Sequence, residues 1–132
     1  MSEQQKPGSI VHVEIPTNNP ARTKKFYGEV FGWTFQDLPE VKYTLFSAPS
    51  GPAGGLREPL STAENRPLNY ILVNSVEDAT KKIRKAGGKI LRGKDEVMGQ
   101  GWWALFEDPT GTVNAVWENN PRALKEAVER QP

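Results

Sequence analysis

The chain has 132 residues, one histidine and no cysteine, and its 17 Lys and Arg against 16 Asp and Glu leave a net charge of +1. This near-balance argues against a nucleic-acid partner, which would need clustered basic residues, and no apolar run approaches the roughly 20 residues that cross a membrane. Without cysteine there is no disulfide, thiolate ligand or thiol nucleophile, so we expect a cytoplasmic protein stabilised by its core alone.

The first strand is predicted at residues 10–15, which read IVHVEI. Alternation places its two valines and its second isoleucine on one face, and His12 and Glu14 on the other. The preceding residues 1–8 are polar, do not resemble a signal peptide, and are expected to form a flexible arm.

A capped helix is predicted next. Asn19 is a suitable N-cap before Pro20, and the segment FYGEVFGW contains Gly32, which suits the left-handed residue that ends a helix. Turn residues then separate three predicted strands, at residues 33–38, 42–48 and 53–58.

The second half of the chain repeats the order of the first. A strand at residues 68–73 precedes the capping-box pattern SVED, which begins a helix that closes at a Gly-Gly pair. Three further strands are predicted at residues 89–92, 102–107 and 112–118. The repeat predicts two βαβββ modules, residues 9–58 and 67–119, joined by a linker at 59–66 and followed by a helical tail at 120–132.

Four features carry a family resemblance: the strand with its histidine, the FGW helix end, the glycine-rich end of the second helix and the turn DPTG. Together, over residues 9–119, they resemble the vicinal oxygen chelate superfamily, which includes glyoxalase I, bleomycin-binding proteins and extradiol dioxygenases. The chain is most similar to the glyoxalase-related subgroup of unassigned function. The resemblance implies an α+β fold in which two βαβββ modules form an open, cup-shaped mixed β-sheet with the helices outside. It also implies a homodimer.

The resemblance further implies four inward-facing positions at which the family's enzymes hold a divalent metal. His12 lies at the first position. The other three fall near Gly55 or Leu56, near Leu68 and near Ala115, and none of these side chains is a metal ligand. Since a dependable catalytic metal needs about three protein ligands, we expect no cofactor, with a divalent metal at His12 as the alternative.

His12 and Glu14 are the candidate catalytic residues, because they share one face and can move a proton near neutral pH. A divergent metal site built from His12, Glu14 and Glu58 would need a strand bulge that shifts the register.

Aromatic and apolar side chains are predicted to line the cup as a small-molecule pocket. Because Trp102 and Trp103 are adjacent in a strand, only one of them faces inward. The candidate ligand-binding residues are Tyr43, Leu68, Tyr70, Trp102, Trp103, Ala115 and Trp117. The leading hypothesis is a protein that binds a small aromatic molecule without a full metal site. The alternatives are a metal-dependent lyase, isomerase or dioxygenase, a metal-free proton-transfer enzyme, and a dimerisation module with a filled cup.

Overall fold

The computed structural model describes residues 5–59 and 66–123. The chain forms two compact units, which we call the first module (Ile10–Asn69) and the second module (Met1–Ser9 with Tyr70–Pro132). The expected linker at 59–66 therefore lies almost entirely outside the described residues, as does most of the tail at 120–132.

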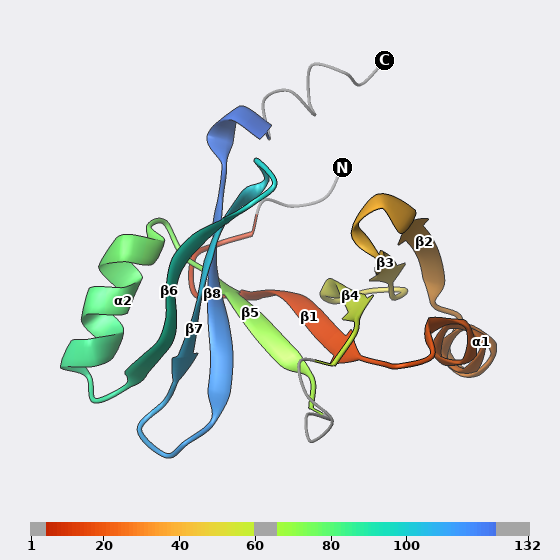
Figure 1. Ribbon diagram of the computed structural model, residues 1–132, viewed down its shortest axis with the longest axis horizontal. Helices are drawn as coiled ribbons and strands as arrows, with labels where there is room; N and C mark the ends of the chain where they lie inside the picture. The colour runs from red at the N-terminus through yellow and green to blue at the C-terminus, as the bar shows by residue number, and fades with distance from the viewer. Residues whose placement is uncertain (1–4, 60–65, 124–132) are drawn as a thin grey trace. The chain divides into compact units, whose positions relative to one another are not determined.

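The first module is a four-stranded mixed sheet with one helix (Figure 1). Its strands lie in the order β2-β3-β4-β1, where β1 and β4 are parallel and the other pairs are antiparallel. The elements are β1 (Ile10–Pro16), α1 (Pro20–Phe31), β2 (Thr34–Leu38), the 3-10 turn η1 (Pro39–Val41), β3 (Tyr43–Ser47) and β4 (Ala53–Arg57).

Both ends of α1 follow the sequence prediction. The Asn19 side chain accepts a hydrogen bond from the Arg22 amide at 3.1 Å, and Gly32 ends the helix with φ at 74°. Gly32 suits this position because it has no Cβ to oppose a positive φ. The rings of Tyr27, Trp33 and Phe46 stack at 4.6 and 4.4 Å, which ties the helix to the sheet.

The second module repeats this topology around a better-packed helix (Figure 1). Its strands lie in the order β5-β8-β7-β6, with β5 parallel to β8. In α2, Val76 is fully buried, and it packs with Ala104 and Val116 of the sheet. The elements are β5 (Leu68–Leu72), whose first two residues still belong to the first module, α2 (Val76–Lys85), β6 (Lys89–Val97), β7 (Gly101–Glu107) and β8 (Val113–Asn119).

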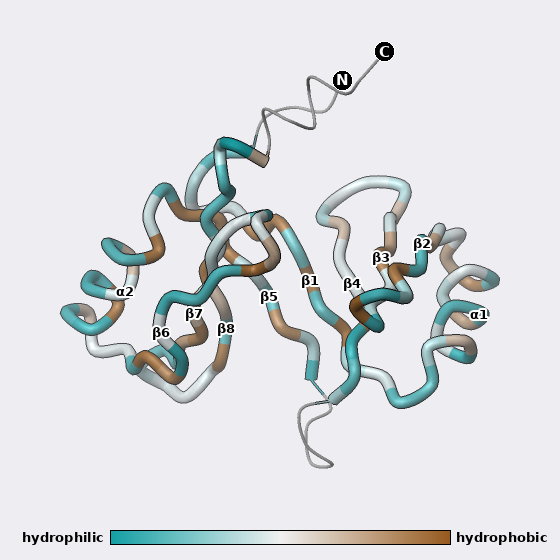
Figure 2. Tube along the Cα trace, turned by 45° about the horizontal axis from the view of Figure 1, so that its top comes forward, coloured by the Kyte–Doolittle hydropathy of each residue, from teal (hydrophilic) through white to brown (hydrophobic). Residues whose placement is uncertain are grey.

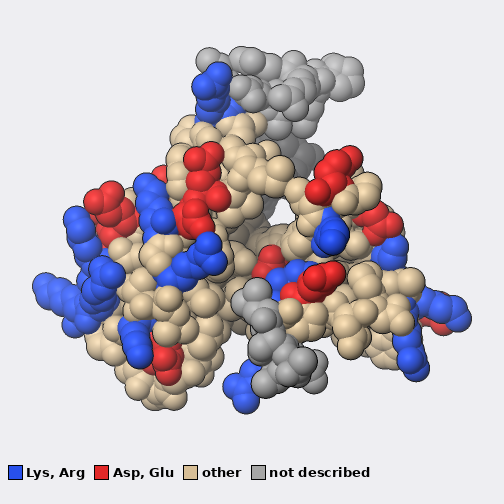
Figure 3. All heavy atoms as spheres, viewed as in Figure 1, with Lys and Arg blue, Asp and Glu red and all other residues tan. Residues whose placement is uncertain are grey.

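Helix α2 is amphipathic, and hydrophilic and hydrophobic segments alternate along its tube (Figure 2). Its basic residues Lys82, Arg84 and Lys85 occupy the last turn, where they complement the helix dipole. Figure 3 shows Lys and Arg side chains gathered over this helix. Within the described residues, no helix is long and apolar enough to span a membrane.

Two predicted boundaries are corrected by the structure. The strand expected at residues 89–92 continues to Val97, with register shifts on both sides of Arg92. The charged residues there break the alternation that would predict a strand, but an edge strand with both faces exposed tolerates them. The end of the expected arm is also paired, because the Gly8 amide donates to the Leu72 carbonyl at 2.7 Å. The part of the expected tail that the structure describes is helical at residues 121–123.

The predicted fold class is confirmed: the chain is an α+β protein with mixed sheets and two βαβββ modules.

Candidate functional site

Four side chains of the first module form one connected chain of hydrogen bonds, which we call the His12 network: His12, Tyr43, Glu14 and Arg57. The Tyr43 hydroxyl lies 2.8 Å from His12 Nε2 and donates to Glu14 Oε2, also at 2.8 Å. Arg57 Nε donates to the other carboxylate oxygen at 3.0 Å, and both of these charged side chains are only 13% exposed. The sequence prediction that His12 and Glu14 share a face therefore agrees with the structure.

Strand pairing explains why these residues meet. In the parallel pair of β1 and β4, Glu14 lies opposite Gly55 and Pro16 lies opposite Arg57. Gly55 is the position over which Tyr43 packs, since a Cβ built on Gly55 would overlap the Tyr43 ring. A glycine at this point of β4 is thus a condition for the His12 network.

The direction of each hydrogen bond sets the tautomer of His12. A phenol has one proton, and Tyr43 donates it to Glu14, whose carboxylate is paired with Arg57. The His12–Tyr43 bond therefore needs a proton on Nε2, so a neutral His12 has its lone pair on Nδ1.

Burial favours this neutral form. Desolvation lowers the pKa of His12 below its ordinary value of 6.5, and the nearby negative charge of Glu14 offsets only part of that effect. At neutral pH His12 is therefore mainly uncharged.

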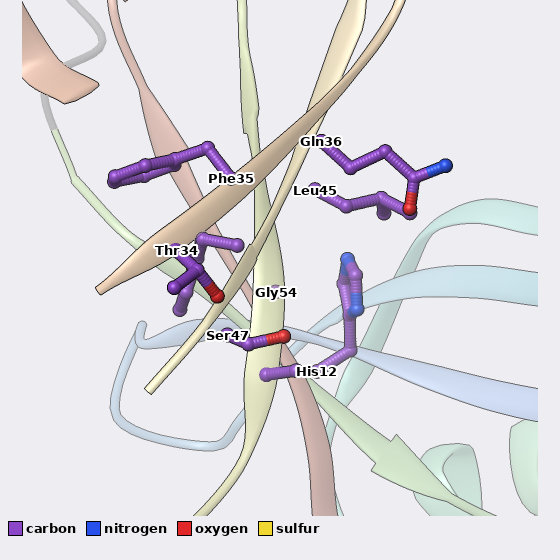
Figure 4. Close-up of a pocket in the computed structure, with 9 residues that line it drawn as sticks. His12, Thr34, Phe35, Gln36, Leu45, Ser47 and Gly54 are labelled. Atoms are coloured by element: carbon purple, nitrogen blue, oxygen red, sulfur yellow. The ribbon is translucent and has the colours of Figure 1, made fainter. Parts of the chain in front are cut away.

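A pocket of about 360 Å³ adjoins His12 in the first module. Figure 4 shows His12, Gln36 and Leu45 pointing to one side of the strands, with Phe35 pointing away. Polar and apolar groups alternate around the pocket. The lining residues are His12, Thr34, Phe35, Gln36, Leu45, Phe46, Ser47, Ala53 and Gly54.

The candidate ligand-binding residues divide into two groups. Tyr43 belongs to the His12 network rather than to the lining of this pocket. In the second module, Trp103 lies opposite Trp117 across β7 and β8, and its ring is 6.1 Å from that of Tyr70. We call these three side chains the aromatic face.

Three other candidates are placed differently from what a ligand-binding role requires. Trp102 packs against the buried core beside α2, so Trp103 is the member of the pair that joins the aromatic face. Ala115 is fully buried and Leu68 is 9% exposed, so neither presents appreciable surface to a ligand.

Sequence reasoning missed Arg57 and most of the pocket lining. Arg57 lies two residues after Gly55 in β4, so strand alternation places it on the face of Gly55, which pairs with Glu14 of β1. This alternation is the sequence pattern from which the position of Arg57 could have been predicted. Gln36, Leu45 and Ser47 could not be placed beside His12 from the sequence, because the order of the strands in the sheet decides which of them are neighbours.

The residues at the expected metal positions do not fit a divalent metal site. At the second position the Tyr43 ring covers a glycine, and Leu68 and Ala115 at the third and fourth offer no donor atom. Arg57 already neutralises Glu14. In the described parts of the chain, no three His, Asp or Glu side chains are grouped as metal ligands, and this includes the set of His12, Glu14 and Glu58.

Two βαβββ modules, each with a mixed sheet, place the chain in the glyoxalase-like class of α+β proteins. The profile of the Glyoxalase/Bleomycin resistance protein/Dioxygenase superfamily matches residues 9–116, and the chain belongs to this superfamily.

Relatives and solved structures agree with this assignment. The chain is 28% identical to the anthracycline biosynthesis protein DauV of Streptomyces sp. (strain C5), over 84% of the chain and 47% of DauV. It thus spans about half the length of the curated relatives it matches first. It is 31% identical to a glyoxylase-like domain-containing protein of Didymella fabae, over 83% and 92% of the two chains. The fold matches methylmalonyl-CoA epimerase from Mycobacterium tuberculosis with a TM-score of 0.67 at 14% identity, over 95% and 97% of the two chains.

Proposed function

We propose that this protein binds a small aromatic molecule beside His12, without a divalent metal. The observation that carries the proposal is the pocket of about 360 Å³, in which His12 is a polar anchor among apolar and neutral polar side chains. This volume lies at the lower end of the range of about 300–1,000 Å³ typical of ligand pockets.

The chemistry of the lining suits a ligand with a hydrogen-bond donor. His12 contributes one polar group to the lining, and Thr34, Gln36 and Ser47 add neutral polar groups that can accept a hydrogen bond. Leu45, which points to the same side of the strands as His12, contributes apolar surface. Phenols and hydroxyquinones combine these two characters.

The relatives give independent support for an aromatic ligand. DauV and DnrV are named as anthracycline biosynthesis proteins, and anthracyclines are polycyclic aromatic molecules. In the second module, the partly exposed rings of Trp103 and Trp117 offer stacking surface of the same kind.

Metal-free proton transfer is the second candidate function. The hydrogen bonds that connect His12, Tyr43 and Glu14 form a path for a proton, and the lowered pKa of His12 keeps it able to accept one at neutral pH. The metal-dependent lyase, isomerase or dioxygenase expected as an alternative would need further ligands beside His12, and the described residues group no three His, Asp or Glu side chains for this.

Titration calorimetry on chelator-treated protein tests the proposal, with 1-naphthol, 1,4-naphthoquinone and 1,8-dihydroxyanthraquinone as probes. We expect saturable binding that added EDTA leaves unchanged. His12→Ala and the pocket-filling Ser47→Trp should each weaken it at least about tenfold, which corresponds to about 1.4 kcal/mol.

Lys89→Trp is the matched control, because it places the same bulk on an exposed strand residue outside the pocket. Binding that persists in Ser47→Trp, or that appears only after a divalent metal is added, would contradict the proposal.

The homodimer implied by the resemblance is also a proposal, which sedimentation velocity would test.

A further inference from the structure

We propose that Tyr43 takes the place of a metal ion in the first module: its hydroxyl bridges His12 and Glu14 at the point where a divalent cation would otherwise be held. This inference deepens the proposed metal-free function. Its test uses metal ions alone, so its failure can be told apart from failure to bind an aromatic ligand.

The first argument is the position of the hydroxyl oxygen. It lies 2.8 Å from His12 Nε2 and 2.8 Å from Glu14 Oε2, between one nitrogen donor and one carboxylate donor. Zinc bonds to such atoms are about 2.0–2.2 Å long. A cation at this point would need each donor to approach by only about 0.6–0.8 Å, which is the difference between these distances.

The second argument is the space around the ring. The family resemblance implies a second metal-ligand position near Gly55, and the Tyr43 ring fills the volume that any side chain of Gly55 would enter. A ligand side chain at position 55 and the Tyr43 ring would therefore occupy the same space, so the two cannot be present together.

The third argument is charge. A divalent cation would compensate the Glu14 carboxylate, and here the Arg57 guanidinium does so through an ion pair at 3.0 Å. Both side chains are 13% exposed, and a carboxylate this well shielded from water needs a positive partner. The hydrogen bond from Tyr43 and the positive charge of Arg57 together compensate the Glu14 carboxylate, as a bound cation would.

The decisive variant is Tyr43→His. An imidazole extended by a metal–nitrogen bond of about 2.0–2.1 Å reaches roughly as far from the backbone as a phenolic oxygen. The variant would thus present three ligands, from His12, Glu14 and the new imidazole, to one cation. We expect chelator-treated Tyr43→His to bind one Co²⁺ or Zn²⁺ per chain, with visible Co²⁺ absorption bands and a melting temperature several degrees higher at about 100 times the Kd.

Controls separate this site from adventitious binding. The unmodified protein and Tyr43→Phe, which keeps the ring, should show no absorption bands and no His12-dependent rise in melting temperature. The bands should also be absent in the double variant His12→Ala/Tyr43→His. If Tyr43→His does not fold, Tyr43→Ala with added imidazole supplies the same third ligand from solution.

Two results would overturn the inference. One is stoichiometric Zn²⁺ or Co²⁺ binding by the unmodified protein that disappears in His12→Ala, since Tyr43 would then not exclude the metal. The other is a folded Tyr43→His, or Tyr43→Ala with imidazole, that binds neither ion.

Discussion

At the scale of single residues, His12 is the only side chain whose ordinary pKa lies between 5 and 8. Its pKa is lowered in the folded protein, chiefly by desolvation. The unfolded chain therefore binds the proton more readily than the folded chain. The contribution of the uncharged His12 to the free energy of unfolding is fully present above its ordinary pKa of 6.5. It is lost as the pH drops through the window just below that value.

The direction of this pH dependence can be measured by urea denaturation at several pH values between 5 and 7.5. We expect the free energy of unfolding to decrease toward pH 5 in the unmodified protein, and the decrease to be smaller in His12→Asn. Asp37, Asp95 and Asp108 also have lowered pKa values, but their windows lie near and below 3.8 and are common to both proteins. A stability that rises on acidification through this range would contradict the assignment.

Tyr43→Phe tests the bridge itself. Removing the hydroxyl leaves His12 Nε2 and Glu14 Oε2 without the oxygen that links them, so we expect a loss of about 1–3 kcal/mol of stability. Tyr27→Phe, in the same module, is the matched control and should cost less than about 0.5 kcal/mol. Equal losses of stability in the two variants would show that the hydrogen bonds of the Tyr43 hydroxyl add no stability beyond that of an ordinary tyrosine hydroxyl.

At the scale of secondary-structure elements, the packing of the Tyr43 ring of β3 onto β4 depends on Gly55. Gly55→Ala would force its new methyl group into the Tyr43 ring, and we expect a loss of about 1–3 kcal/mol or more from this overpacking. Gly93→Ala in β6 meets no atom within 4 Å and should be neutral or slightly stabilising. Thermal denaturation of both variants makes the comparison.

A double-mutant cycle identifies the cause. In a Tyr43→Ala background, alanine at position 55 should cost clearly less, because the ring it displaces is gone. Strictly additive effects would mean that the cost of Gly55→Ala arises elsewhere.

The elements also show what the sequence can and cannot predict. Alternation in IVHVEI correctly separates His12 and Glu14 from the apolar face of β1, because a strand period of two needs no knowledge of the partner strands. The role of Tyr43 could not be predicted, since it depends on the pairing of β3 with β4 and on the space above Gly55. The sequence predicts only residues 89–92 of β6, because the charged residues that follow show no alternation of polar and apolar side chains.

At the scale of the whole molecule, the two modules share a topology but differ in how they bury their helices. Helix α1 has no buried residue, and Phe26, Val30 and Phe31 are more than half exposed. Helix α2 buries Val76 and Thr80. The repeat seen in the sequence therefore predicts the architecture correctly but not how firmly each helix is packed.

Hydrogen exchange should report this difference. We expect the amides of α1 to exchange faster than those of α2, because local opening of α1 exposes little buried apolar surface. Mass spectrometry of peptides that cover each helix measures both rates in one sample. Equal protection of the two helices would indicate that a surface absent from the isolated chain covers α1.

The central claim is that His12 is held as a neutral imidazole with its proton on Nε2, bonded to Tyr43 and not to a metal. Nitrogen-15 NMR of the single histidine tests this directly, since the two ring nitrogens report separately on protonation and metal binding. We predict a protonated Nε2 and an unprotonated Nδ1 at pH 7.5, with no change on adding either EDTA or one equivalent of Zn²⁺. A proton on Nδ1, or a stoichiometric shift of Nε2 with Zn²⁺, would contradict the claim.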